Sequence, residues 1–269
     1  MDKLTELLHL RYGKGFPTEI EGNDFLEILL SHRSILAYSA QPLPTGTLET
    51  LVAAAQSAAT SSNLQTWSVV AVEDVNRKEK LAQLAGNQAY IRQCPLFLVW
   101  LADLARLSYV AESRGMPHEG LDYLEMFLTA TVDAALAAQN AAVAAESLGL
   151  GTVYIGAMRN KPEEVAATLG LPPHVFAVFG MCVGYADQAA SIKPRLPQQA
   201  VLHRETYQLN QEESIANYNE VMKAFYTSQQ MNVAGDWAEH SSKRIANGEA
   251  LSGRDRLREA LQNLGFKLR

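Results

Sequence analysis

Two cations, Lys193 and Arg195, stand two residues apart in the segment 191–203, which reads SIKPRLPQQAVLH. Pro194 and Pro197 hold this backbone extended. Residues i and i+2 of an extended segment project to the same side, so both cations converge on one small anion. A compact lysine charge and a planar arginine fork together suit a phosphate. The alternative is an ordinary solvent-exposed loop, and the other polar segments of the chain decide between the two.

Three such segments are widely separated in the sequence. Residues 31–38, SHRSILAY, place two phosphate donors two positions apart, provided that the segment is extended. Residues 60–67, TSSNLQTW, gather hydroxyls and amides before a predicted strand, where they suit a polar ring with several carbonyl and N–H groups. Residues 151–160, GTVYIGAMRN, carry a strand to Gly156, where a flat ligand can approach the backbone closely. Taken singly, each segment also fits an ordinary turn or cap.

Composition limits the classes of protein to consider. The chain has 269 residues, 48% of them hydrophobic, and a net charge of −6, which favours a soluble protein with a substantial core over a general nucleic-acid surface. Cys94 and Cys182 lie in apolar runs without metal spacing, so we expect buried free thiols. The N-terminus lacks a signal-peptide pattern, and the alanine-rich residues 128–145 are too short and too polar to span a membrane. We therefore expect a cytoplasmic protein without nucleic-acid, membrane or metal partners.

The pattern of apolar residues predicts a mixture of helices and short strands. A continuous apolar run over 95–101 predicts a strand buried on both faces, residues 74–76 predict a turn, and Asn23 is a candidate helix N-cap. No regular βαβ rhythm, GxGxxG, GxxxxGK[ST] or GxSxG motif is present, which favours an α+β layered fold. We expect helices over 3–10, 24–31, 47–59, 77–84, 121–148, 162–169, 212–226, 236–246 and 253–264, and strands over 67–73, 95–101, 152–155 and 175–185.

The segments HRSI, SSNLQ, GNQ, YIG with RN, and KPRLP followed by a histidine occur in this order over residues 24–226. Together they resemble the FMN-dependent nitroreductase family, in its oxygen-insensitive nitroreductase and NAD(P)H:flavin oxidoreductase branch. The resemblance implies a mostly antiparallel central sheet flanked by helices, with a helical C-terminal arm. It also implies a homodimer with two FMN sites at its interface. We expect an N-terminal extension at 1–23, an FMN-binding core at 24–205 and the arm at 206–269.

The same resemblance assigns site residues. It implies that the FMN phosphate is held by His32, Ser34, Lys193 and Arg195. It places Ser61, Ser62 and Asn63 at the ribityl chain and ring, and Gln88 at the pyrimidine side of the ring. It also implies that Tyr154, Ile155 and Gly156 line one face of the ring, with the Gly156 N–H near flavin N5. A donor suits N5, which accepts the hydride.

The implied enzyme is an NAD(P)H-dependent FMN oxidoreductase with a ping-pong reaction. NADPH or NADH passes hydride to flavin N5 and leaves, and a nitroaromatic, quinone or flavin acceptor takes its place. No catalytic side chain is expected, because the cofactor performs the chemistry and the protein orients it. Two alternatives stay open: a flavoenzyme with one dedicated substrate on the same scaffold, and a flavin-binding redox sensor that does not turn over.

The sequence departs from its relatives at four places. Leu36 stands where a second basic residue is common, and Ala157 where a glycine is common. The excursion 228–236, SQQMNVAGD, lacks the arginines that often accompany NADPH preference, so NADH is also a candidate donor. The extension before Asp24 is interpreted as a peripheral helix that adds only stability.

Overall fold

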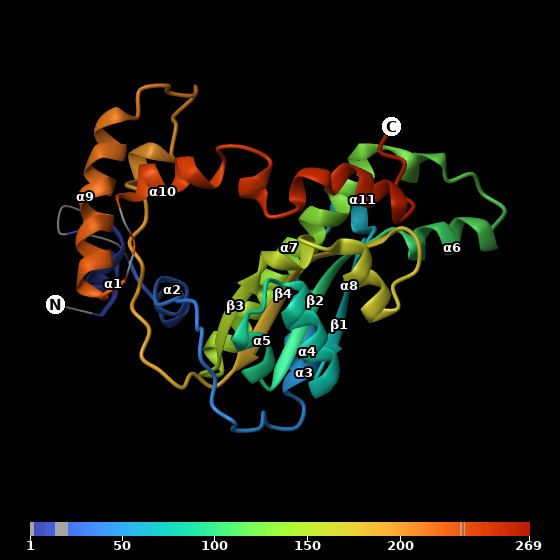
Figure 1. Ribbon diagram of the computed structural model, residues 1–269, viewed down its shortest axis with the longest axis horizontal. Coiled ribbons are helices and arrows are strands. Elements are labelled where there is room, and N and C mark those ends of the chain that lie inside the picture. The colour runs from blue at the N-terminus through green and yellow to red at the C-terminus, as the bar shows by residue number, and fades with distance from the viewer. Residues whose placement is uncertain (1–2, 14–20, 232, 234) are drawn as a thin grey trace. The chain divides into compact units, whose positions relative to one another are not determined.

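The computed structural model of the protein describes residues 3–13, 21–231, 233 and 235–269 (Figure 1). By compactness the chain divides into two units. We call Met1–Arg33 with Ala190–Leu251 the helical unit, and Ser34–Ala189 with Ser252–Arg269 the sheet unit.

An antiparallel sheet forms the centre of the sheet unit, with the strand order β1-β2-β4-β3. All eight residues of β2 are buried, so the predicted strand buried on both faces is confirmed. β2 and β4 pair along their length with one register shift between Trp100 and Leu101. The strands are β1 (Trp67–Val72), β2 (Leu96–Asp103), β3 (Gly151–Ile155) and β4 (Val175–Gly184).

The alanine-rich helix α7 (Leu124–Ser147) packs against this sheet and against α3 (Thr47–Gln56) (Figure 1). Its small side chains let the backbones approach closely, and the core there joins α7 to alternate residues of β2. The helix ends where Gly149 takes a left-handed φ of 76° and the Leu150 N–H donates to the Ala145 carbonyl. The predicted central position of this helix is confirmed.

Several shorter helices complete the sheet unit. The prediction of a turn over 74–76 is wrong, because the Asp74 side chain accepts from the Arg77 N–H and caps a helix that begins at Val75. Two helices were not predicted, one of only five residues and one with a single buried residue. The helices are α4 (Val75–Leu84), α5 (Ala89–Gln93), α6 (Ala105–Ser113), α8 (Pro162–Leu169) and α11 (Leu257–Asn263), with 3-10 turns η1 (Ser61–Asn63), η2 (Glu119–Asp122), η3 (Gly156–Arg159) and η6 (Arg254–Arg256).

The helical unit is built from two segments of the chain that lie far apart in the sequence. Asn23 caps α2 by accepting from the Leu26 N–H at 2.9 Å, as predicted. Aromatic and apolar side chains of α9 form the core of this unit together with partly buried Leu196 and Trp237. The helices are α1 (Lys3–Tyr12), α2 (Asp24–Leu30), α9 (Glu212–Ser228) and α10 (Trp237–Arg244), with 3-10 turns η4 (Gln198–Ala200) and η5 (Glu249–Leu251).

The C-terminal residues 252–269 belong to the sheet unit. Phe266 is buried, and the backbone of Arg269 exchanges hydrogen bonds with Asp122 and Leu124 at the start of α7. The predicted arm 206–269 is thus shared between the two units, and the division into extension, core and arm stays a prediction. Within the described part of the chain, none of the helices combines the length and apolar character needed to cross a membrane.

Both cysteines are buried and free of disulfides, as predicted. Burial raises the pKa of the Cys182 thiol well above its ordinary value. Such a thiol stays protonated and behaves as a small apolar side chain.

One ion pair ties η6, at the start of α11, to α8. Arg256 donates to both carboxylate oxygens of Glu163, at 2.7 and 3.0 Å, and Asn263 donates to the same group at 3.1 Å. The hydrogen bond from Arg256 is the main cause that lowers the pKa of Glu163 to about 2. A lowered folded-state pKa contributes stability above the ordinary glutamate pKa and loses it as the pH falls toward 2.

We therefore expect Glu163→Gln to lower the free energy of unfolding at pH 7 by about 1–2 kcal/mol, after allowance for solvent screening of this partly exposed pair. The gap between variant and parent should close between pH 4.5 and 2, in urea titrations followed by circular dichroism. Glu164→Gln is the matched control, since Glu164 makes an exposed contact with Lys161 at 3.4 Å and, among the described residues, no bond to η6 or α11. A gap that is the same at every pH would contradict the prediction.

Candidate functional site

The predicted site residues lie on both units. His32, Lys193 and Arg195 belong to the helical unit. The sheet unit carries the remainder: Ser34, Ser61, Ser62, Asn63, Gln88, Tyr154, Ile155 and Gly156.

In the helical unit, the KPR segment has the exposure pattern of an extended chain, and its backbone is bonded to Arg11 and Tyr218. Lys193 and Arg195 are exposed and Pro194 between them is buried, which is the alternation that the sequence predicted. The Tyr218 hydroxyl of α9 donates to the Pro194 carbonyl at 3.0 Å. Burial raises the pKa of Tyr218, against the opposing effect of nearby Arg195. The two cations thus project from a fixed backbone.

The His32 and KPR segments come together through Arg11 of α1, which sequence reasoning missed. Arg11 is buried and donates to the carbonyls of His32 and Lys193 at 2.5 and 3.0 Å. The interpretation of the extension as a peripheral helix leaves out these contacts. The available signal was an arginine in the last turn of a helix, on the same face as the buried leucines Leu4, Leu7 and Leu8.

In the sheet unit, the segment 60–66 has an unusual backbone. Ser62, Asn63 and Gln65 have positive φ values of 48°, 56° and 52°. Such conformations cost non-glycine residues about 1–3 kcal/mol each and persist only where the surroundings hold them. The predicted ligand residues Ser61, Ser62 and Asn63 are exposed on this segment.

Asp133 of α7 holds the strained segment through four hydrogen bonds to its carboxylate. Its carboxylate accepts from the Thr60 and Thr66 hydroxyls at 2.5 and 2.9 Å, and from the backbone N–H groups of Ser61 and Thr66 at 3.1 and 3.2 Å. The side chain is 2% exposed. A carboxylate can accept several hydrogen bonds, so one buried residue fixes both ends of the segment. Its signal in the sequence was a charged residue within an alanine-rich helix.

Arg106 of α6 bonds the C-terminal end of the same segment and the start of β1. It donates to the carbonyls of Gln65 and Trp67 at 2.8 and 3.2 Å and to the Ser68 hydroxyl at 2.6 Å. A hollow of about 450 Å³ lies here, open to solvent. It is lined by Val52, Gln56, Leu64, Gln65, Trp67, Ser68, Val69 and Arg106.

The end of β3 presents the third group of predicted residues. The Tyr154 ring stands edge-on to Phe179 at 5.2 Å, and its hydroxyl donates to Gln139 at 3.4 Å. Burial raises the pKa of Tyr154, so it stays protonated at neutral pH. The Ile155 side chain is buried, and its backbone pairs with Gly180 of β4. A Cβ on Gly156 would lie 3.3 Å from Nη2 of Arg159, tighter than usual contact.

Two guanidinium groups adjoin Gly156. Arg159 donates to the Val178 carbonyl at 2.5 Å, and Arg254 donates to Asn160 at 2.8 Å. Burial, together with the nearby charge of Arg254, lowers the pKa of Arg159. This corner of the sheet unit favours a ligand group that carries negative charge or lone pairs.

Gln88 and Ser34 lie apart on other elements of the sheet unit. Gln88 precedes α5, and its Oε1 atom is buried with no hydrogen-bond partner among the described residues. A buried acceptor of this kind is satisfied when a donor from a ligand reaches it. Ser34 is exposed and pairs in parallel with Thr152 at the edge of β3.

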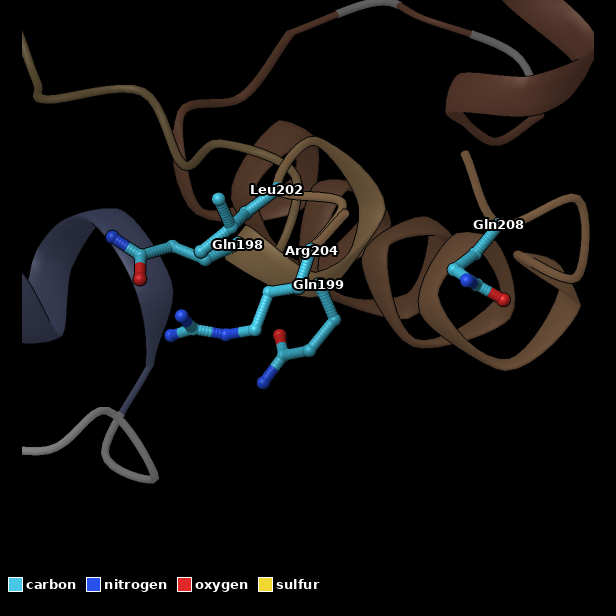
Figure 2. Close-up of a pocket in the computed structure, with 5 residues that line it drawn as sticks. All are labelled: Gln198, Gln199, Leu202, Arg204 and Gln208. Atoms are coloured by element: carbon cyan, nitrogen blue, oxygen red, sulfur yellow. The ribbon is translucent and has the colours of Figure 1, made fainter. Parts of the chain in front are cut away.

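Another hollow, of about 420 Å³, lies in the helical unit beyond the KPR segment. Figure 2 shows four of its lining residues grouped on and after η4, and Gln208 apart from them at the right of the view. The five are Gln198, Gln199, Leu202, Arg204 and Gln208. Three neutral amides offer no acid, base or nucleophile, so we assign no chemistry to this hollow.

The structure describes two of the sequence departures, Leu36 and Ala157, in full. Leu36 is exposed, and Arg33 donates to the Ser31 carbonyl at 3.0 Å. Ala157 is buried in η3. The excursion 228–236 includes positions 232 and 234, which lie outside the described residues.

Comparison with known proteins identifies the chain's relatives. The model of the nitroreductase family matches residues 29–185, and that of the nitroreductase family C-terminal domain matches residues 193–269. An FMN reductase (NADPH) of Bacillus subtilis is 39% identical over 248 residues, which cover 91% of this chain and 98% of that protein.

Solved structures give the same result. The structure of NfrA2 from B. megaterium superposes with a TM-score of 0.87 and 38% identity, covering 92% of this chain and 100% of that one. The NADPH:FMN oxidoreductase of Vibrio harveyi, solved with NAD+, gives 0.83 and 35%, with coverage of 92% and 100%. The predicted α+β layered fold is confirmed, and the chain belongs to the nitroreductase family.

Proposed function

We propose that the protein is an FMN-dependent NAD(P)H oxidoreductase that reduces nitroaromatic, quinone or flavin acceptors by a ping-pong reaction. Its family membership supports this, as does similarity over nearly the whole chain to an FMN reductase and to an NADPH:FMN oxidoreductase. The observation that carries the proposal is that this chain covers both relatives almost completely. In addition, the polar segments expected at the cofactor site are present, and Asp133 and Tyr218 bond their backbones.

The residues present fit FMN. The unsatisfied Oε1 of Gln88 is a buried acceptor suited to a ring N–H. Gly156 leaves the space that a Cβ would fill beside Arg159. The exposed cations Lys193 and Arg195 project from one extended segment and suit a terminal phosphate.

Bound FMN would supply the two-electron redox chemistry. The protein's own residues bind and orient. In this proposal His32, Ser34, Lys193 and Arg195 hold the phosphate, and Ser61, Ser62 and Asn63 meet the ribityl chain and the ring. Gln88 bonds the pyrimidine side, and Tyr154, Ile155 and Gly156 line one face. The nearby guanidinium groups of Arg159 and Arg254 stabilise negative charge in this corner.

The cofactor test uses the flavin absorption band near 450 nm, recorded before and after anaerobic addition of NADH or NADPH. We expect purified protein to carry FMN or to take it up, and either nicotinamide to bleach the band. The faster donor establishes the nicotinamide preference, which the arginine-poor excursion leaves to experiment. Protein that stays colourless with supplied FMN would remove the proposal.

An acceptor screen separates the alternatives. A generalist reductase turns over many nitroaromatics, quinones and flavins, whereas an enzyme with a dedicated substrate turns over almost none of them. FMN that neither nicotinamide can bleach would instead indicate a flavin-binding sensor. A cytoplasmic location is part of the proposal.

We further propose a homodimer whose two FMN sites lie at the interface and draw residues from both chains. One side of α7 presents apolar residues at four-residue intervals, and each is about half exposed. An apolar stripe of this length on a helix surface indicates a protein contact. The stripe, which we call the α7 stripe, consists of Leu124, Leu128, Val132 and Leu136.

We expect the parent protein to sediment at twice the chain mass of 29.5 kDa. The double variant Val132→Glu/Leu136→Glu places two charges in the α7 stripe, and it should sediment at the mass of one chain and lose FMN. Val110→Glu on α6 is the matched control, because Val110 has similar exposure and lies outside the stripe. A variant that stays dimeric would show that another surface joins the chains.

A further inference from the structure

Arg11 occupies an unusual environment for a charged side chain. It lies near the end of α1 and is 5% exposed. Its guanidinium donates to three backbone carbonyls: Nε to Leu30 at 3.1 Å, Nη2 to His32 at 2.5 Å and Nη1 to Lys193 at 3.0 Å. Five N–H donors in a rigid plane allow one arginine to join several carbonyls at once. One side chain therefore connects the end of α2 with the KPR segment.

The backbone of Arg11 adds a fourth contact, because its carbonyl accepts from the Arg195 N–H at 2.9 Å. In an extended segment the C=O of residue i and the N–H of residue i+2 point to the same edge. Arg11 thus binds one edge of the KPR segment at both cation positions. Tyr218 binds the opposite edge through the Pro194 carbonyl.

Fixing both edges of an extended segment fixes the direction of its side chains. The side chains of residues i and i+2 project perpendicular to those edges and to one face. The contacts of Arg11 and Tyr218 therefore determine the face from which Lys193 and Arg195 project. When the backbone that carries two cationic side chains is already fixed, the segment loses less conformational entropy on binding an anion. Pre-organisation of this kind increases affinity.

We propose that Arg11 is a positioning residue of the anion-binding site, which aligns His32, Lys193 and Arg195 through their backbone groups without touching the anion itself. The inference rests on the proposed function, in which this anion is the FMN phosphate. Arg11 lies outside both ranges that match the family models, 29–185 and 193–269, so the N-terminal extension contributes a part that those models do not describe. The resemblance implied a basic residue at position 36, where this chain has Leu36. The phosphate site therefore depends more on Lys193 and Arg195, whose backbone Arg11 holds in place.

The test compares FMN with riboflavin, which has the same ring and ribityl chain but no phosphate. Dissociation constants are measured from quenching of flavin fluorescence in the full-length apoprotein. The ratio of the riboflavin constant to the FMN constant reports the phosphate contribution within each variant. A variant that only loosens the fold changes both constants together and leaves the ratio unchanged.

We expect Arg11→Ala to lower this ratio about tenfold or more, with the riboflavin constant nearly unchanged. Misaligned cations should lose at least one charge-assisted hydrogen bond to the phosphate, and each such bond changes affinity by about one decade or more. Arg11→Lys should restore part of the ratio, because an ammonium group can still bond one or two of the carbonyls. Tyr218→Phe, which removes a single hydroxyl at the opposite edge, should lower the ratio less and keeps the test available if Arg11→Ala fails to fold. Lys3→Ala is the control on the same helix, since exposed Lys3 pairs with Glu27 at 2.6 Å and, among the described residues, has no hydrogen bond to the KPR segment.

An unchanged ratio in folded Arg11→Ala, or a change of the ratio equally large in Lys3→Ala, would overturn the inference. If Arg11→Ala is unfolded, an unchanged ratio in both Arg11→Lys and Tyr218→Phe would overturn it as well. A parent protein that binds riboflavin as tightly as FMN would overturn both the inference and the proposed phosphate site. A parent that prefers FMN but is not bleached by either nicotinamide would remove the proposed activity alone, and the ratio would still decide the role of Arg11.

Discussion

Replacing Asp133 by alanine is expected to lower the free energy of unfolding by about 3–5 kcal/mol, because it leaves two hydroxyls and two backbone N–H groups without their buried acceptor. The same change should release the strained segment 60–66, whose positive φ values depend on the four hydrogen bonds to Asp133 as well as on Arg106. Since this segment carries Ser61, Ser62 and Asn63, we also expect weaker binding of both FMN and riboflavin.

Urea titrations and flavin titrations of the variant measure these two effects. Asn140→Ala is the matched control: Asn140 also lies on α7, but its side chain donates to the Ala54 carbonyl and not to the 60–66 segment. We expect the control to lose about 1 kcal/mol, with flavin binding unchanged. Asp133→Asn should fall between the two, because an amide offers one acceptor oxygen. Flavin affinity that survives Asp133→Ala in a folded protein would contradict the assignment of this segment to the cofactor.

The double variant Lys193→Ala/Arg195→Ala should weaken FMN binding about 100-fold or more, since each charge-assisted hydrogen bond to a phosphate contributes about 1.5–3 kcal/mol. Riboflavin affinity should change little. Both side chains are exposed, so their removal should leave the fold intact.

Fluorescence titrations at low and high salt measure this effect. The FMN affinity of the parent should fall with added salt, and that of the double variant should depend on salt much less. Leu36→Arg offers the reverse experiment, because it adds a basic residue where the resemblance led us to expect one, and it should tighten FMN binding. Equal losses of FMN and riboflavin affinity in the double variant would show that the KPR segment does not bind the phosphate.

Much of the secondary structure followed from local sequence. The apolar run at 95–101 predicted a fully buried strand, and β2 has all eight residues buried. Asn23 predicted the start of α2, and the glycines after Leu148 predicted the end of α7. These predictions held because apolar periodicity, caps and left-handed glycines act within a few residues of one another. The helices α5 and α6 were missed because each buries only one residue, which leaves little periodic signal.

The polar residues within α7 mark the limit of that reasoning. Asp133, Gln139 and Asn140 appeared in the sequence only as interruptions of an alanine-rich helix. In the structure Asp133 holds the 60–66 segment, Gln139 accepts from Tyr154, and Asn140 donates to the Ala54 carbonyl. A buried carboxylate such as that of Asp133 requires partners, so its presence in the helix signalled long-range contacts. The identity of those partners depends on how distant segments pack, and local sequence carries no record of it.

By itself, the sequence determined the α+β class, most helices and strands, the alternation of Lys193 and Arg195 about Pro194, and the resemblance that the comparisons confirmed. Only the tertiary structure revealed what holds the candidate site: Arg11 on the carbonyls of His32 and Lys193, and Asp133 beneath Ser61. The physical reason is that periodicity and turn chemistry depend on neighbours along the chain. A buried arginine or carboxylate bonds whichever backbone groups folding brings within about 3 Å of it, however far away they lie in the sequence.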